Sequence, residues 1–169
     1  GVPKNALQHL PCLDSPDLDC LTAHEKLSFI IFTGSTDTAQ HIKKNNPTIP
    51  LHAETGGKNA IIVTALADRD EAISHIIESA FSFGGQKCSA TSLLILESEV
   101  FHDKKFKSSL IDAVKSLEVG HVWNLHHHYG PLIKPPTGAL KACLLQYEKH
   151  KQSVVSSQKN IANNHIVSP

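Results

Sequence analysis

At its centre the chain contains Ala53-Glu54-Thr55-Gly56-Gly57-Lys58-Asn59 and, one apolar helix later, Gly84-Gly85-Gln86-Lys87-Cys88-Ser89-Ala90. The first segment supplies a carboxylate that can act as a base, and the second supplies a thiol that can act as a nucleophile. Both are set among glycines, which let the backbone approach a ligand closely and adopt turns that a Cβ would obstruct. Taken alone, neither segment decides between a reactive site and a tight turn.

Short apolar runs around these segments predict strands over residues 28–33, 49–53, 59–64 and 92–96. Helices are expected between them, because Ser35 and Asp68 are suitable N-caps for segments that run to about residue 44 and residue 83. Gly84-Gly85 is expected to end the second of these helices. Further helices are expected over residues 100–117 and 137–150. Strands that alternate with helices predict an α/β layered fold with a largely parallel sheet.

Charge and cysteine content exclude several classes of function. The chain has 169 residues and a formal net charge of zero, which argues against nucleic acid or an anionic membrane as a partner. No apolar run reaches the roughly 20 residues that cross a bilayer. The cysteines show no C-x-x-C spacing, which favours a reducing compartment such as the cytosol. Three of them are expected to be partly buried apolar groups: Cys12, Cys20 and Cys143.

A third motif, Phe32-Thr33-Gly34-Ser35-Thr36, precedes the other two. In this order the three resemble the motifs of the aldehyde dehydrogenase superfamily, and the likeness runs from Gly1 to about Leu145. Most members have a leucine after the glutamate. The Ala-Glu-Thr-Gly-Gly version, with Lys-Cys-Ser-Ala after Gly-Gln, is more similar to the branch that oxidises glutamate γ-semialdehyde, the open form of pyrroline-5-carboxylate. That branch includes the dehydrogenase part of bifunctional proline-catabolic proteins.

The resemblance implies a role for each motif. Cys88 is expected to add to the aldehyde as the nucleophile, and Glu54 to activate the water that hydrolyses the thioester. The implied cofactor is NAD, with NADP as the alternative, and its expected contacts are Phe32, Thr33, Gly34, Ser35, Thr55 and Gly56. Gly34 is expected to allow a sharp turn there. Ser89 and Lys87 are candidates for holding the substrate carboxylate, while a purely local backbone role for Ser89 stays equally open.

A histidine cluster raises the question of a metal site. His126-His127-His128, with His121 nearby, belongs to a total of 12 histidines. Three consecutive side chains point in different directions, and neither an H-x3-H spacing nor a cysteine pair accompanies them, so we expect no metal.

Family members are much longer than this chain, so the resemblance implies an internal fragment. Residues 1–57 would end the NAD-binding domain, residues 58–150 would begin the cysteine-bearing catalytic domain, and residues 151–169 would form a polar, loosely ordered tail. The fragment alone is expected to be inactive, because the family's oxyanion and ribose contacts have no counterpart in it. The parent is expected to be a homo-oligomeric enzyme for a small-molecule aldehyde, in the cytoplasm or, in a eukaryote, the mitochondrial matrix. The alternative is a truncated or degenerate non-catalytic relative that acts as an interaction module.

Overall fold

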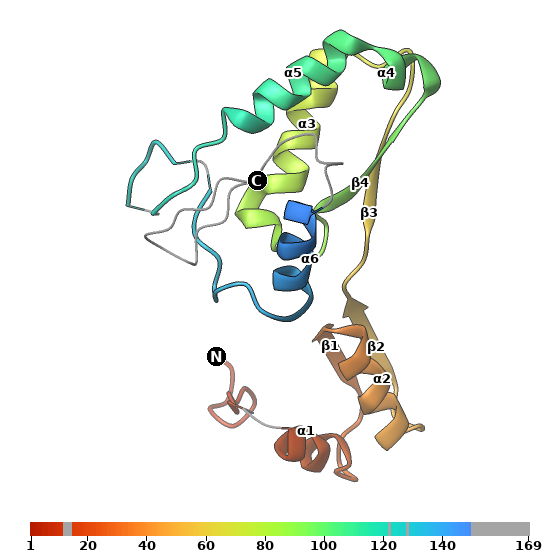
Figure 1. The fold of residues 1–169 in the computed structure, drawn as a ribbon. Coiled ribbons are helices and arrows are strands. Elements are labelled where there is room, and N and C mark those ends of the chain that lie inside the picture. The colour runs from red at the N-terminus through yellow and green to blue at the C-terminus, as the bar shows by residue number, and fades with distance from the viewer. Residues whose placement is uncertain (12–14, 122, 128, 150–169) are drawn as a thin grey trace. The chain divides into compact units, whose positions relative to one another are not determined.

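The structure is a computed structural model that describes residues 1–11, 15–121, 123–127 and 129–149. The chain divides into two compact units, Gly1–Gly56 and Gly57–Pro169 (Figure 1). The assignment of these parts to a cofactor-binding and a catalytic domain stays a prediction. The expected loose tail over residues 151–169 lies outside the described residues, as does Cys12.

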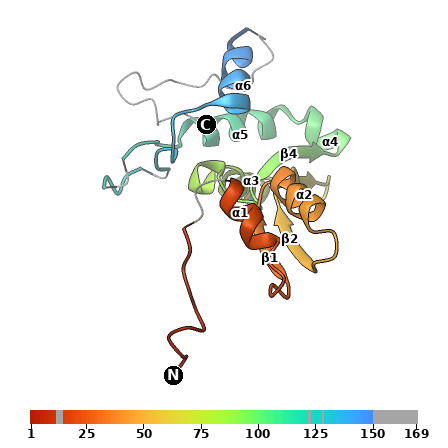
Figure 2. The ribbon, with the colours of Figure 1, turned by 90° about the horizontal axis from the view of Figure 1, so that it is seen from below.

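The first unit is a pair of parallel strands with two helices. Strand β1 (Ile30–Gly34) pairs in parallel with β2 (Leu51–Thr55). Helix α2 (Thr36–Asn45) connects the strands and contacts both of them, and it also contacts α1 (Ser15–Thr22) (Figure 2). The apolar residues Ala39, Ile42 and Ile49 are buried in this unit.

Polar side chains fix both ends of α2. The Oγ of Ser35 accepts a hydrogen bond from the Thr38 N–H at 3.1 Å, so the expected N-cap is confirmed. At the other end the N–H of Asn46 donates to the Ile42 carbonyl at 2.9 Å. The side-chain amide of Asn46 donates to the Thr22 carbonyl at 2.8 Å, which ties the end of α2 to the end of α1.

The second unit also contains a parallel pair of strands. Strand β3 (Asn59–Val63) pairs with β4 (Thr91–Leu96), with an irregularity between Asn59 and Ala60. The other elements of the unit are α3 (Arg69–Phe81), η1 (Ser82–Gly85), α4 (Ser98–His102), α5 (Lys104–Lys115) and α6 (Gly138–Lys149). The parallel α/β architecture is confirmed, and the described strands divide between two small sheets.

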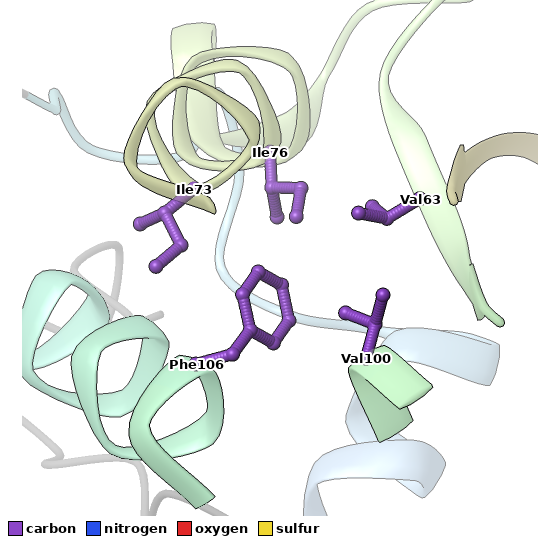
Figure 3. Close-up of a cluster of buried hydrophobic side chains, with 5 residues drawn as sticks. All are labelled: Val63, Ile73, Ile76, Val100 and Phe106. Carbon is purple, nitrogen blue, oxygen red and sulfur yellow. The ribbon is translucent and has the colours of Figure 1, made fainter. Parts of the chain in front are cut away.

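A cluster of buried apolar side chains holds α3, α4 and α5 against one face of β3 and β4. Its members converge from β3, α3, α4 and α5 (Figure 3), and they are Val63, Ile73, Ile76, Val100 and Phe106. Fully burying one such side chain contributes about 1.5–3 kcal/mol. Side chains that alternate with the core residues along the strands are exposed, namely Ile62, Leu93 and Ile95. Within the second unit, the described residues therefore cover only one face of this sheet.

The prediction of one continuous helix over residues 100–117 is wrong. The segment divides at Asp103, whose carboxylate accepts hydrogen bonds from the N–H groups of Lys105 at 2.9 Å and Phe106 at 3.1 Å. Asp103 is at once the C-cap of α4 and the N-cap of α5. Aspartate is favoured at such positions because its side chain competes with the backbone for nearby N–H groups.

Two further expectations change in detail. Helix α3 begins after its expected N-cap, Asp68, and it ends at Phe81, slightly before the expected end at about residue 83, because Ser82 leaves the helical backbone conformation. Cys20 and Cys143 are exposed, so the expectation that they are partly buried is wrong. Only the first of these changes touches the candidate site.

Candidate active site

Cys88 lies in a tight turn between η1 and β4. The N–H of Ala90 donates to the Lys87 carbonyl at 3.1 Å, which closes the turn with Cys88 and Ser89 as its central residues. The cysteine is exposed and is not part of a disulfide. Its thiol is therefore accessible to a small molecule.

The segment before this turn has a left-handed backbone. The φ angles of Phe83, Gly84 and Gly85 are 55°, 64° and 68°. A Cβ on Gly85 would lie 3.2 Å from the Ala80 carbonyl oxygen, so glycine is required there by conformation and by space. A phenylalanine in this region costs on the order of 1–3 kcal/mol, and residues held in this way cluster at functional sites.

Lys87 and Ser89 flank Cys88, and both are exposed. The ammonium of Lys87 lies 5.3 Å from the centre of the Phe83 ring, within the range of a cation–π contact. No hydrogen bond among the described residues involves the Ser89 hydroxyl, so a purely local backbone role for Ser89 finds no support in this part of the chain. Both side chains therefore stand beside the thiol with donors exposed to solvent.

Asn59 is a site residue that the sequence reasoning missed. Its side-chain amide donates to the carbonyls of Cys88 at 2.7 Å and Ala90 at 3.2 Å. These bonds connect the start of β3 to the turn that contains Cys88. The hydroxyls of Ser79 and Thr91 share a hydrogen bond of 2.8 Å, which ties α3 to the start of β4. The available signal was a polar side chain at the first position of an otherwise apolar strand, directly after Gly-Gly-Lys.

Glu54 lies in the unit Gly1–Gly56, beside the Phe32–Thr36 motif. In the parallel register of β1 and β2, Thr33 is opposite Glu54 and Gly34 is opposite Thr55. Both strands end here, and ligands of open parallel sheets bind outside the carboxyl ends of the strands. The structure therefore brings together the carboxylate and the residues expected to contact the cofactor.

The sharp turn expected at Gly34 stays a prediction. Gly34 is not among the glycines with positive φ, but a Cβ at this position would overlap the ring of Phe32. The Phe32 ring therefore covers Gly34, and a larger residue at this position would displace the ring. By contrast, a Cβ on Gly56 would meet nothing within 4 Å.

The turn from β1 into α2 has features that favour an anion and one that opposes it. Ser35 already caps the Thr38 N–H, whereas the N–H groups of Thr36 and Asp37 have no acceptor within the helix. Such groups at a helix N-terminus attract phosphate. The carboxylate of Asp37, in the first turn, is the one feature of this segment that opposes an anion.

Glu54 belongs to the unit Gly1–Gly56 and Cys88 to the unit Gly57–Pro169. Their use of a common pocket stays a prediction. The structure does connect two separate sets of site residues. Glu54 and Thr55 lie beside the Phe32–Thr36 motif, and Cys88 lies with Lys87, Ser89 and Asn59.

His127 lies within hydrogen-bonding distance of two residues that shortly precede it in the chain. The Nδ1 of His127 lies 3.3 Å from the His121 carbonyl, and its Nε2 lies 3.3 Å from the amide of Asn124. Within the described ranges, no group of three or more His, Cys, Asp or Glu could hold a metal ion, and His128 lies outside those ranges. In the same part of the chain, no helix has both the length and the apolar character that spanning a bilayer requires.

Comparison with known proteins identifies relatives. A model described as the aldehyde dehydrogenase family matches residues 1–169. The chain is 33% identical over 141 residues to 1-pyrroline-5-carboxylate dehydrogenase 1 of Halalkalibacterium halodurans, covering 79% of this chain and 27% of that protein. It is 34% identical over 142 residues to the bifunctional protein PutA of Klebsiella aerogenes, covering 79% of this chain and 11% of that protein. The chain thus spans a minor part of the length of these relatives.

Solved structures show the same likeness. Proline Utilization A (PutA) from Corynebacterium freiburgense matches with a TM-score of 0.79 and 39% identity, over 89% of this chain and 15% of that one. Betaine aldehyde dehydrogenase from Staphylococcus aureus, solved in complex with NAD+, matches with a TM-score of 0.67 and 28% identity, over 78% of this chain and 25% of that one.

Proposed function

Because the chain belongs to the aldehyde dehydrogenase family, we propose that the protein carrying it oxidises glutamate γ-semialdehyde to glutamate with NAD, in proline degradation. The observation that carries the proposal is the similarity to enzymes named 1-pyrroline-5-carboxylate dehydrogenase. The alignment spans 79% of the chain, so about a fifth of the residues at most can lie outside it at either end. Glu54 and Cys88 both lie farther from the ends than that, so the alignment includes both of them.

Cys88 is the proposed nucleophile. Its thiolate sulfur bonds to the aldehyde carbon, and the carbonyl oxygen of the aldehyde takes the negative charge. NAD, when bound, supplies the hydride acceptor for that carbon, so that the substrate becomes a thioester on Cys88. The exposed turn around Cys88 supports this role because a carbonyl compound can reach the sulfur.

Glu54 is the proposed base for the second half of the reaction. Its carboxylate takes a proton from a water molecule while the water oxygen attacks the thioester carbon. The carbon–sulfur bond then breaks, which releases the carboxylic acid and returns Cys88 to the thiolate. The exposed position of Glu54 at the end of β2 leaves its carboxylate open to water.

The same proposal covers the remaining contacts. Ser89 and Lys87 would donate to the carboxylate of the semialdehyde, since both flank Cys88 and both are exposed. The cofactor would lie along Phe32, Thr33, Gly34, Ser35, Thr55 and Gly56, which gather where β1 and β2 end. A homo-oligomeric assembly and a cytoplasmic location, or the mitochondrial matrix in a eukaryote, belong to this proposal as well.

The test is NADH formation from glutamate γ-semialdehyde by the protein that carries this chain. Cys88→Ala is expected to abolish turnover, because no other group replaces the sulfur. Glu54→Gln is expected to release one equivalent of NADH quickly and then to turn over on the order of 10²–10⁴-fold more slowly, because thioester hydrolysis lacks its base.

Cys20→Ala is the matched control, since Cys20 is also an exposed free thiol but lies on α1. This variant is expected to keep full activity. No NADH from the unmodified protein, or unchanged turnover in Cys88→Ala, would overturn the enzymatic proposal and leave a non-catalytic interaction role.

A further inference from the structure

Asn59 connects the beginning of β3 to the turn that carries Cys88. Its Nδ2 donates to the carbonyl of Cys88 at 2.7 Å and to that of Ala90 at 3.2 Å. The regular pairing of β3 with β4 is disturbed at this point, where Asn59 is opposite Thr91 but Ala60 is opposite Leu93. The side-chain amide therefore extends the link between the two strands beyond the last regular pair.

The two accepting carbonyls lie on either side of Ser89. The turn also has its own hydrogen bond, from the N–H of Ala90 to the Lys87 carbonyl at 3.1 Å. Together these bonds fix each peptide plane from Lys87 to Thr91, so the exposed turn has little freedom to change its backbone angles. Without the Asn59 amide, the carbonyls of Cys88 and Ala90 would lose this donor, and the bond internal to the turn would remain.

We infer that Asn59 is a positioning residue for the proposed reaction, because it holds the Lys87–Ala90 turn in the one conformation that fixes the Cys88 sulfur. This inference rests on the proposed role of Cys88 as nucleophile. Addition to a carbonyl needs the sulfur close to its line of attack, and a displacement of about 1 Å can cost on the order of 10²-fold in rate. Asn59 reaches no reacting atom itself and acts through the backbone.

The chemistry of the amide explains why asparagine fits this position. One NH2 group carries two hydrogens and can donate to two carbonyls at once. An aspartate of the same shape would instead set a carboxylate against two carbonyl oxygens, and an alanine would leave both carbonyls without this donor. The other ties nearby, from Ser79 to Thr91 and from Lys87 to Phe83, do not involve the carbonyls of the turn.

The kinetic test compares Asn59→Ala and Asn59→Asp with the unmodified protein. Both variants are expected to lower kcat on the order of 10-fold to 100-fold while the KM for NAD stays unchanged, because the sulfur loses its fixed orientation. Alkylation of Cys88 by iodoacetamide is expected to stay as fast or to become faster, since a small reagent approaches an exposed thiol from many directions. A general loss of folding would instead change NAD affinity and thermal stability together.

The matched control is Asn46→Ala, which removes another asparagine side chain that donates to a backbone carbonyl, that of Thr22 at 2.8 Å. It is expected to keep kcat. An unchanged kcat in Asn59→Asp, or an equal loss of kcat in Asn46→Ala, would overturn the inference.

Hydrogen exchange tests the two hydrogen bonds from Asn59 to the Cys88 and Ala90 carbonyls, here called the clamp, independently of catalysis. Loss of the Asn59 amide is expected to speed exchange over residues 83–91 and to leave α5 unchanged, and unchanged exchange over residues 83–91 would overturn the inference. If the unmodified protein forms no NADH, the proposed function fails while this measurement still decides the clamp. If neither variant folds, the unmodified protein decides it, because the side-chain NH2 hydrogens of Asn59 donate to two carbonyls and should exchange more slowly than those of the exposed Asn5, and equal rates would contradict the clamp.

Discussion

The glycines around Cys88 and Glu54 differ in what requires them. Gly85 has a φ of 68°, and a Cβ there would press on the Ala80 carbonyl, whereas a Cβ on Gly56 would find open space. Gly85→Ala is therefore expected to lower the free energy of unfolding by about 1–2 kcal/mol, the cost of a left-handed conformation with a Cβ. Gly56→Ala should change it by less than about 0.5 kcal/mol. Urea unfolding followed by circular dichroism measures both, and equal effects would contradict the role given to Gly85.

Tyr129 is expected to make the stability of the second unit depend on pH in the alkaline range. It is buried and meets the Phe81 ring edge-on, with the ring centres 6.3 Å apart. Burial of the phenol, and then the negative charge of Glu78, raise the pKa of Tyr129 above its ordinary value of 10.0. As pH rises through the pKa that the phenol has in the unfolded chain, the unfolded chain loses the phenol proton first. The folded state then binds more protons than the unfolded state, so the free energy of unfolding falls.

The expected result is that the free energy of unfolding decreases above about pH 10 in the unmodified protein relative to Tyr129→Phe. Below that pH the difference between the two proteins should be constant. Urea unfolding at a series of pH values measures the effect, and Glu78→Gln should reduce it. Parallel pH profiles for the unmodified protein and Tyr129→Phe would show that the phenol does not titrate with unfolding.

Helix ends depend on short polar side chains. Asp103 caps α5 and lies 3.7 Å from the Nε of Arg69 in a part-exposed ion pair. Asp103→Ala is expected to lower the free energy of unfolding by about 1 kcal/mol, because the N–H groups of Lys105 and Phe106 lose their acceptor. Asp103→Asn should cost less, since asparagine caps equally well and a part-exposed ion pair contributes little. Thermal unfolding ranks the two variants, and a larger loss in Asp103→Asn would mean that the ion pair matters more than the cap.

The secondary structure could be predicted where local chemistry decides it. Ser35 and Asp68 cap helices as their side chains predict, because an N-cap bond joins residues two or three positions apart. The division at Asp103 was missed because the apolar spacing of α4 continues into α5 and resembles one helix. The end of α3 at Phe81 was missed because Ser82, an ordinary residue in sequence terms, takes an extended conformation one residue before the left-handed Phe83.

The stability of the second unit rests on its own buried cluster. Phe106 is 2% exposed within that cluster, whereas Phe101 on α4 is 66% exposed. Phe106→Ala is expected to cost about 3–5 kcal/mol, because it leaves a cavity among Val63, Ile73, Ile76 and Val100. Phe101→Ala should change stability by less than about 0.5 kcal/mol. Hydrogen exchange in β3, α3 and α5 measures both, and similar protection in the two variants would contradict the assigned core.

The sequence by itself determined the family, the order of the strands β1 to β4 and the candidate groups Glu54 and Cys88, because motifs and short apolar runs are local patterns. Only the tertiary structure decided that Asn59 holds the Cys88 turn and that Thr33 stands opposite Glu54. These relations join residues far apart in the chain through strand register and side-chain reach. A shift in either strand pair would remove them without changing any motif, which is why no local pattern could predict them.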